Sequence, residues 1–292
     1  MAGAHPLGTG PVDTSDGLTV ALHDLGGTGP ALLVCHATGL CGRAYERLAA
    51  ALTDAFHVWA VDFRGHGDSP APADDDFSWD GMVRDAEAAA AAIGGGPIHA
   101  VGHSMGGAVA LAVEARTPGT FATAYVYEPI VMEPDAVRPA RNFLAEGARQ
   151  RRNVFASREA ALWRFAVRPP LNELESGSLA AYVQHGFADQ DDGTVRLKCS
   201  GENEARTFEA SGVITTTAVA PAALPTVVGC GAPDTPLAGM ARSVAAALPA
   251  GELRAHPELG HFGPLQAPTV IGAEIRQHIE AVRCQGRHPA GR

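Results

Sequence analysis

The stretch Ile98-His-Ala-Val-Gly-His-Ser-Met-Gly-Gly-Ala-Val-Ala-Leu-Ala-Val-Glu-Ala-Arg116 decides the fold of this chain. Its apolar start, residues 98–101, indicates a buried strand, and the run from Met105 to Arg116 indicates a helix. Between them, Gly102-His-Ser-Met-Gly106 fits the G-x-S-x-G pattern, which places a serine on a sharp strand-to-helix turn. Ser104 could instead be a helix cap in a glycine-rich turn, but the strand before it and the helix after it favour a nucleophile.

The same alternation of strand and helix continues on both sides of this stretch. Continuous short apolar runs are typical of strands covered on both faces, so the pattern predicts an α/β fold with a doubly wound, mostly parallel sheet. The predicted strands are residues 20–25, 31–35, 58–61, 98–101, 122–127 and 226–230, and the predicted helices are 44–52, 79–93, 105–116, 237–248 and 269–283.

The alternation stops between about Met132 and Ala220. This region shows helical patterns and few strands, and it is too long for an ordinary connection. We therefore predict a core formed by residues 1–131 and 221–292 and a helical cap formed by residues 132–220, with helices at 142–152, 157–167 and 178–187.

A serine hydroxyl needs a neighbouring base to become a nucleophile. His261, in Glu258-Leu-Gly-His-Phe-Gly-Pro264, follows a short predicted strand at 252–255 and precedes the last helix. A loop after a strand end can expose a catalytic group and still hold it. His256 lies at the strand end itself, and most other histidines precede Ser104 and break the usual chain order of serine, acid, histidine. We predict His261 as the base.

The base needs an acid to orient it, and two carboxylates compete for this role. Asp234, in Gly231-Ala-Pro-Asp-Thr-Pro236, follows the strand that ends near Cys230 and fits the usual chain order. Glu128 follows the preceding strand, and a carboxylate there could reach the same histidine. We predict Asp234 as the acid and keep Glu128 as the alternative.

Acyl transfer also needs donors for the developing oxyanion. One is expected to be the backbone N–H of Met105, directly after the nucleophile. The other is assigned to the backbone N–H of Thr38, in the loop His36-Ala-Thr-Gly39 that follows the strand at 31–35.

Composition excludes several classes of protein. The chain has 292 residues, a formal net charge of −10 and a single lysine, so binding to nucleic acid is not expected. Its five cysteines are odd in number and widely spaced, which favours reduced thiols over a disulfide framework or a zinc site. Neither a signal peptide nor a membrane span is visible, so we expect a cytoplasmic protein.

Together these segments resemble the alpha/beta hydrolase superfamily, in its serine-nucleophile branch with a helical cap. The resemblance covers roughly residues 17–131 and 222–283, and it implies an eight-stranded, mostly parallel sheet with a cap inserted after the sixth strand. Ala37 stands where the family usually has glycine. The motifs that carry the resemblance are His36-Ala-Thr-Gly, Asp62-Phe-Arg-Gly-His-Gly-Asp-Ser, Gly102-His-Ser-Met-Gly-Gly, Asp234 and Gly260-His261.

The resemblance implies a serine hydrolase that cleaves a carboxylic ester or lactone through an acyl-enzyme. A carbon–carbon bond, a thioester or an amide passes through a similar oxyanion, and a small-molecule receptor that keeps the triad is a further alternative. The serine at position 104 argues against the epoxide hydrolase and haloalkane dehalogenase chemistries, which use aspartate there. The expected partner is a small-molecule substrate, no metal or cofactor is needed, and the sequence gives no indication of oligomeric state.

The first part of the predicted cap is rich in arginine. These residues form either a solvated helix face or a site that attracts an anionic substrate, in which case replacing Arg151 and Arg152 is expected to raise KM for anions. Trp163, Phe165 and Phe143 are candidates for a pocket lining or for the core of the cap. The arginines are Arg138, Arg141, Arg149, Arg151, Arg152, Arg158, Arg164 and Arg168.

Overall fold

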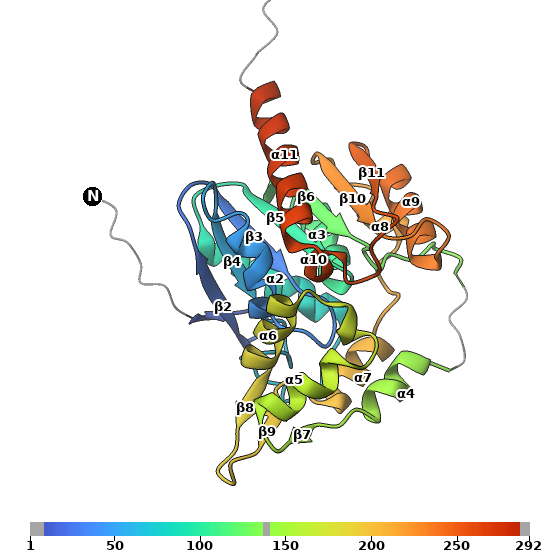
Figure 1. Cartoon of the computed structure of the whole chain (residues 1–292). Helices are drawn as coiled ribbons and strands as arrows, with labels where there is room; N and C mark the ends of the chain where they lie inside the picture. The colour runs from blue at the N-terminus through green and yellow to red at the C-terminus, as the bar shows by residue number, and fades with distance from the viewer. Residues whose placement is uncertain (1–8, 137–140, 287–292) are drawn as a thin grey trace, which may run out of the picture.

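The computed structural model describes residues 9–136 and 141–286, and an eight-stranded sheet forms its centre (Figure 1). β1 pairs antiparallel with β2 and β2 antiparallel with β4, whereas all other neighbours are parallel. This is the predicted α/β sheet. In spatial order the strands are β1 (Thr9–Asp13), β2 (Thr19–Gly26), β4 (His57–Val61), β3 (Ala31–Cys35), β5 (Ile98–His103), β6 (Phe121–Tyr127), β10 (Thr226–Cys230) and β11 (Gly251–Ala255).

Helices cover both faces of this sheet. Side chains of α2 (Trp79–Ile93), α3 (Met105–Arg116) and α9 (Pro236–Ala247) belong to one apolar core. Side chains of the 3-10 turn η1 (Gly42–Tyr45), α1 (Glu46–Ala50), α10 (Gly263–Gln266) and α11 (Pro268–Gly286) belong to a second apolar core. The two cores explain why the inner strands read as continuous apolar runs.

The connection from β6 to β10 contains the predicted insertion, and in Figure 1 its elements gather below the core, except the last one, which lies beside α9. The three predicted helices are present. The sequence missed a small antiparallel sheet of order β7-β9-β8, because strands of two or three residues carry no readable periodicity. The elements are α4 (Phe143–Arg149), β7 (Val154–Phe155), α5 (Arg158–Ala166), η2 (Leu171–Glu173), α6 (Ser176–His185), β8 (Phe187–Asp189), β9 (Val195–Leu197), α7 (Gly201–Glu209) and α8 (Thr216–Val219).

The parallel strands bring the loops at their carboxyl ends to one edge of the sheet. The loops after β3, β5, β6 and β11 hold Thr38, Ser104, Glu128 and His261 respectively. Ligands of open α/β sheets bind at this edge. None of the helices in the described ranges combines the length and apolar character that crossing a membrane requires.

Candidate active site

Ser104 lies on the turn between β5 and α3. Its backbone has φ 54° and ψ −116°, a conformation that residues other than glycine rarely adopt. A Cβ at Gly102 would come 2.5 Å from Cα of Gly107, and one at Gly106 would come 2.1 Å from the carbonyl oxygen of Cys35. Glycine is therefore required at both ends of the motif, because backbone passes at these distances. The turn holds Ser104 in a strained position at the start of a helix.

His261 connects the serine to a carboxylate. The distance from Ser104 Oγ to His261 Nε2 is 3.1 Å, and the distance from His261 Nδ1 to Glu128 Oε2 is 2.7 Å. An ionised carboxylate only accepts hydrogen bonds, so Nδ1 carries the proton and Nε2 is free to accept from the serine hydroxyl. Ser104, His261 and Glu128 thus form one hydrogen-bonded chain with the donor order that activates a serine.

The carboxylate of Glu128 is held on both oxygens. Glu128 directly follows β6, has φ 42°, and donates its backbone N–H to the carbonyl of Gly229 at 2.8 Å. Oε1 accepts the backbone N–H of Gly231 at 2.9 Å, which leaves Oε2 for His261. Only 2% of the Glu128 side chain is exposed, so its orientation is set by these two bonds.

The structure corrects the prediction of the acid, because it does not bring Asp234 to His261. Asp234 is exposed in the turn between β10 and α9, where Thr235 rather than Asp234 caps the helix. The strands β6 and β10 are adjacent and parallel, so both carboxylates leave the same edge of the sheet. The sequence shows that two candidates are close to the histidine but cannot show that the chain turns sharply at Glu128.

The competing histidine, His256, has a different set of partners. Its Nε2 lies 2.8 Å from Oε2 of Glu274 in α11, and the hydroxyl of Tyr125 donates to the same carboxylate oxygen at 2.6 Å. This contact joins β11 to α11 and leaves His261 as the histidine that contacts the nucleophile.

The two residues assigned to the oxyanion lie against each other. The Thr38 hydroxyl is 3.4 Å from Sδ of Met105, which joins the loop after β3 to the first residue of α3. The N–H of a first helical residue has no acceptor within its own helix. The role of the Thr38 and Met105 N–H groups as oxyanion donors stays a prediction.

His103 links the base to the loop after β3, and it is one of the histidines that the sequence set aside because they precede Ser104. Its Nε2 lies 2.7 Å from the carbonyl oxygen of His261, and its Nδ1 lies 2.7 Å from the hydroxyl of Tyr45, which accepts the N–H of Ala37 at 3.2 Å. Burial lowers the pKa of His103 well below its usual value, so the ring is neutral and carries a single proton. That proton is on Nε2, because the carbonyl of His261 can only accept a hydrogen bond. This series of hydrogen bonds joins the base to the loop that holds Thr38.

One group of side chains in the described ranges has the spacing of metal ligands: His23, Asp62 and Asp68. Asp62 already accepts the backbone N–H groups of Gly42 at 2.6 Å and Asp68 at 2.7 Å. These bonds hold the turn after β4.

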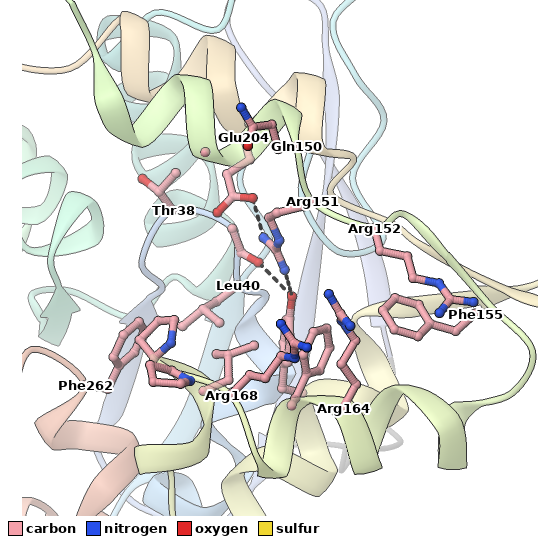
Figure 2. Close-up of a pocket in the computed structure, with 17 residues that line it drawn as sticks. Thr38, Leu40, Gln150, Arg151, Arg152, Phe155, Arg164, Arg168, Glu204 and Phe262 are labelled. Atoms are coloured by element: carbon pink, nitrogen blue, oxygen red, sulfur yellow. Dashed lines mark hydrogen bonds and ion pairs between the residues drawn. The ribbon is translucent and has the colours of Figure 1, made fainter.

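A cavity of about 360 Å³ opens between the loop after β3 and the insertion (Figure 2). Thr38, Leu40 and Phe262 line it from the core, and Phe262 directly follows His261. Of the three aromatic candidates in the insertion, only Phe165 lines the cavity. Trp163 and Phe143 are 71% and 69% exposed and do not line the cavity. They therefore belong neither to the pocket nor to the core of the insertion.

Comparison with known proteins agrees with this fold. A model of the alpha/beta hydrolase family matches residues 32–273. Protein phosphatase methylesterase 1 of Mus musculus is 28% identical over 173 residues, which is 57% of this chain and 44% of that protein. Pimeloyl-[acyl-carrier protein] methyl ester esterase of Methylococcus capsulatus is 36% identical over 97 residues, which is 33% of this chain and 36% of that protein.

The similarity to solved structures extends over the whole fold. The crystal structure of E-2-(acetamidomethylene)succinate hydrolase superposes with a TM-score of 0.77, at 20% identity, over 94% of this chain and 99% of that one. At this identity the likeness shows the fold alone, whereas the family model spans most of the present chain. The chain therefore belongs to the alpha/beta hydrolase family.

Proposed function

We propose that this protein is a serine hydrolase that cleaves a carboxylic ester or lactone through an acyl-enzyme. The observation that carries the proposal is the hydrogen-bonded chain Ser104–His261–Glu128, in which a strained serine, a base and a buried carboxylate meet at the carboxyl edge of the sheet. Nucleophile, base and orienting acid within hydrogen-bond distance are the geometric signature of covalent acyl transfer.

In the proposed reaction, Ser104 Oγ attacks the substrate carbonyl while His261 Nε2 takes the hydroxyl proton. The carbonyl oxygen becomes an oxyanion, which the N–H groups of Thr38 and Met105 stabilise. The intermediate collapses, the bond to the leaving oxygen breaks, and His261 gives its proton to that oxygen. A water molecule then attacks the acyl-enzyme with His261 as base, which releases the acid and restores Ser104. Glu128 stabilises the imidazolium in both halves.

An ester is favoured by two observations. Two relatives are named a methylesterase and a methyl ester esterase, and both names describe cleavage of a methyl ester. The cavity is small, which suits a compact ester better than a long chain. Thioester, amide and carbon–carbon bond hydrolysis use the same groups and are the alternatives, as is a receptor that binds without turnover.

Labelling tests the proposal directly. A fluorophosphonate is expected to modify the protein at Ser104, because the base that activates the serine is already in contact with it. The labelled residue is identified by mass spectrometry, and a panel of short p-nitrophenyl esters measures turnover. Labelling and turnover should both be lost in Ser104→Ala. A folded protein that resists the probe would contradict the proposal, and labelling without ester turnover would indicate one of the alternatives.

His103→Leu is expected to lower kcat about tenfold and to leave KM within twofold, because the loops of the base and the oxyanion lose their common partner. Tyr45→Phe removes the next bond of the same chain and should have a smaller effect of the same kind. Steady-state kinetics with one p-nitrophenyl ester gives both constants, and unfolding temperatures control for stability.

The double variant distinguishes positioning from general loss of stability. Residues that act through one hydrogen-bonded chain should give a combined loss well below the product of the single losses. Losses in kcat that multiply, or an effect on KM alone, would show that His103 does not position the site.

A further inference from the structure

The wall of the cavity formed by the insertion is strongly basic, although the chain carries a formal net charge of −10. The lining contains four guanidinium groups and one carboxylate, that of Glu204. Such a local reversal of charge concentrates anions at a site. The arginines of this wall are Arg151, Arg152, Arg164 and Arg168.

Two of these arginines already have partners. Arg151 forms an ion pair with Glu204, which neutralises the one carboxylate of the cavity. Arg151 also donates to the hydroxyl of Tyr182 at 2.9 Å. Arg152 donates to the carbonyl of Val154 at 2.7 Å, and its guanidinium carbon lies 4.7 Å from the ring centroid of Phe155. Arg151 and Arg152, which the sequence suggested as anion-binding residues, therefore stabilise the wall of the cavity.

The other two arginines have no partner among the residues that the structure describes. Arg164 lies in the last turn of α5 and Arg168 follows one turn later, and within residues 9–136 and 141–286 neither guanidinium makes a hydrogen bond or an ion pair. Figure 2 shows both side chains beside the cavity, across from Thr38 and Phe262. Of the other arginines predicted for the cap, Arg141, Arg149 and Arg158 form ion pairs with carboxylates, and Arg138 lies outside the described residues. Both residues are exposed and line the cavity, so their guanidinium groups are accessible to a ligand that enters it.

We propose that the substrate carries an anionic group, a carboxylate or a phosphate, which Arg164 and Arg168 bind while the ester carbonyl lies at Ser104. This inference rests on the proposed function and adds the class of substrate. The planar guanidinium forks suit the oxygens of either anion, and the same cavity of about 360 Å³ is lined by both arginines and by Thr38 of the loop after β3. Arg151 cannot serve in this way unless Glu204 releases it.

Anion binding is measured first in Ser104→Ala, so that no turnover interferes. Calorimetric titration with glutarate and with inorganic phosphate is expected to show binding of at least one anion, and the two titrations separate carboxylate from phosphate. Arg164→Gln and Arg168→Gln should each weaken that binding about tenfold, as expected for loss of a charge-assisted hydrogen bond. Arg196→Gln is the matched control, because Arg196 is an exposed arginine of the same insertion outside the cavity.

The kinetic test compares p-nitrophenyl hydrogen glutarate with p-nitrophenyl pentanoate, which has a methyl group in place of the carboxylate. With the uncatalysed rates subtracted, the double variant of Arg164 and Arg168 should lose at least tenfold in kcat/KM for the glutarate ester. It should stay within twofold of the unsubstituted protein for the pentanoate ester. High salt should reduce the difference between the esters, because salt screens the attraction.

The outcomes separate the two proposals. Failure of both anions to bind, binding that the two substitutions do not change, or equal losses on both esters would overturn the anionic substrate and leave the serine hydrolase intact. Arginine-dependent anion binding without turnover of any ester would support the anion site and count against ester hydrolysis.

Discussion

Glu128→Gln is expected to lower kcat about ten-thousandfold at neutral pH while the fold and substrate binding are retained. The substitution preserves the size of a buried side chain and removes only its charge. In serine hydrolases of other folds, the equivalent loss of a carboxylate has an effect of this size, because the histidine then adopts the wrong tautomer.

The surroundings of Glu128 explain why glutamine cannot adapt. The N–H of Gly231 donates to Oε1 at 2.9 Å, so the amide oxygen of a glutamine must face Gly231 and its NH2 group must face His261. A donor opposite Nδ1 forces the ring proton onto Nε2. His261 would then donate to Ser104 instead of accepting its proton. The opposite orientation would place two donors against each other at Gly231.

Asp234→Asn is the matched control for this experiment. It makes the same chemical change at an exposed turn residue after the neighbouring strand, and kcat is expected to stay within twofold. Pre-steady-state acylation and steady-state turnover of a p-nitrophenyl ester measure both variants. A large loss in Asp234→Asn together with an active Glu128→Gln would restore the acid that the sequence favoured.

The two carboxylates illustrate where prediction from the sequence stops. Hydrophobic runs predicted the strands before Glu128 and Asp234, and the parallel order of those strands predicted that both residues share an edge. Which side chain points at His261 depends on the backbone at one residue. Glu128 has a φ of 42°, and no periodicity or composition signals such a turn.

The elements that the sequence predicted well are those with long apolar repeats. The strand and helix around Ser104 lie as expected because almost every side chain from Ile98 to Val113 is buried. The strands of the insertion were missed because Val154–Phe155 and Val195–Leu197 are too short to alternate. The arginines of the insertion were visible in the sequence, but which of them have partners was not, because the partner of Arg151, Glu204, lies 53 residues away along the chain.

Gly106→Ala is expected to destabilise the protein by about 3 kcal/mol or more and to lower the unfolding temperature by roughly 10 °C. The added methyl group would meet the carbonyl oxygens of Cys35 at 2.1 Å and His36 at 2.6 Å. Both atoms belong to backbone that enters the loop after β3, so neither can move without shifting Thr38. Activity should therefore fall even in the fraction of protein that remains folded.

Gly239→Ala separates this effect from the general effect of a helical glycine. Gly239 lies inside α9, and the nearest atom to its added methyl group is the far end of the Arg242 side chain at 3.9 Å. Alanine stabilises a helix interior relative to glycine by about 0.5–1 kcal/mol, so this variant should be slightly more stable and fully active. Thermal unfolding and ester turnover are measured for both variants, so that the effect of the same added methyl group is compared in α3 and in α9. A stable and active Gly106→Ala would mean that the backbone after β3 approaches α3 less closely than the structure shows. The predicted role of Thr38 as an oxyanion donor, which depends on this approach, would then be contradicted.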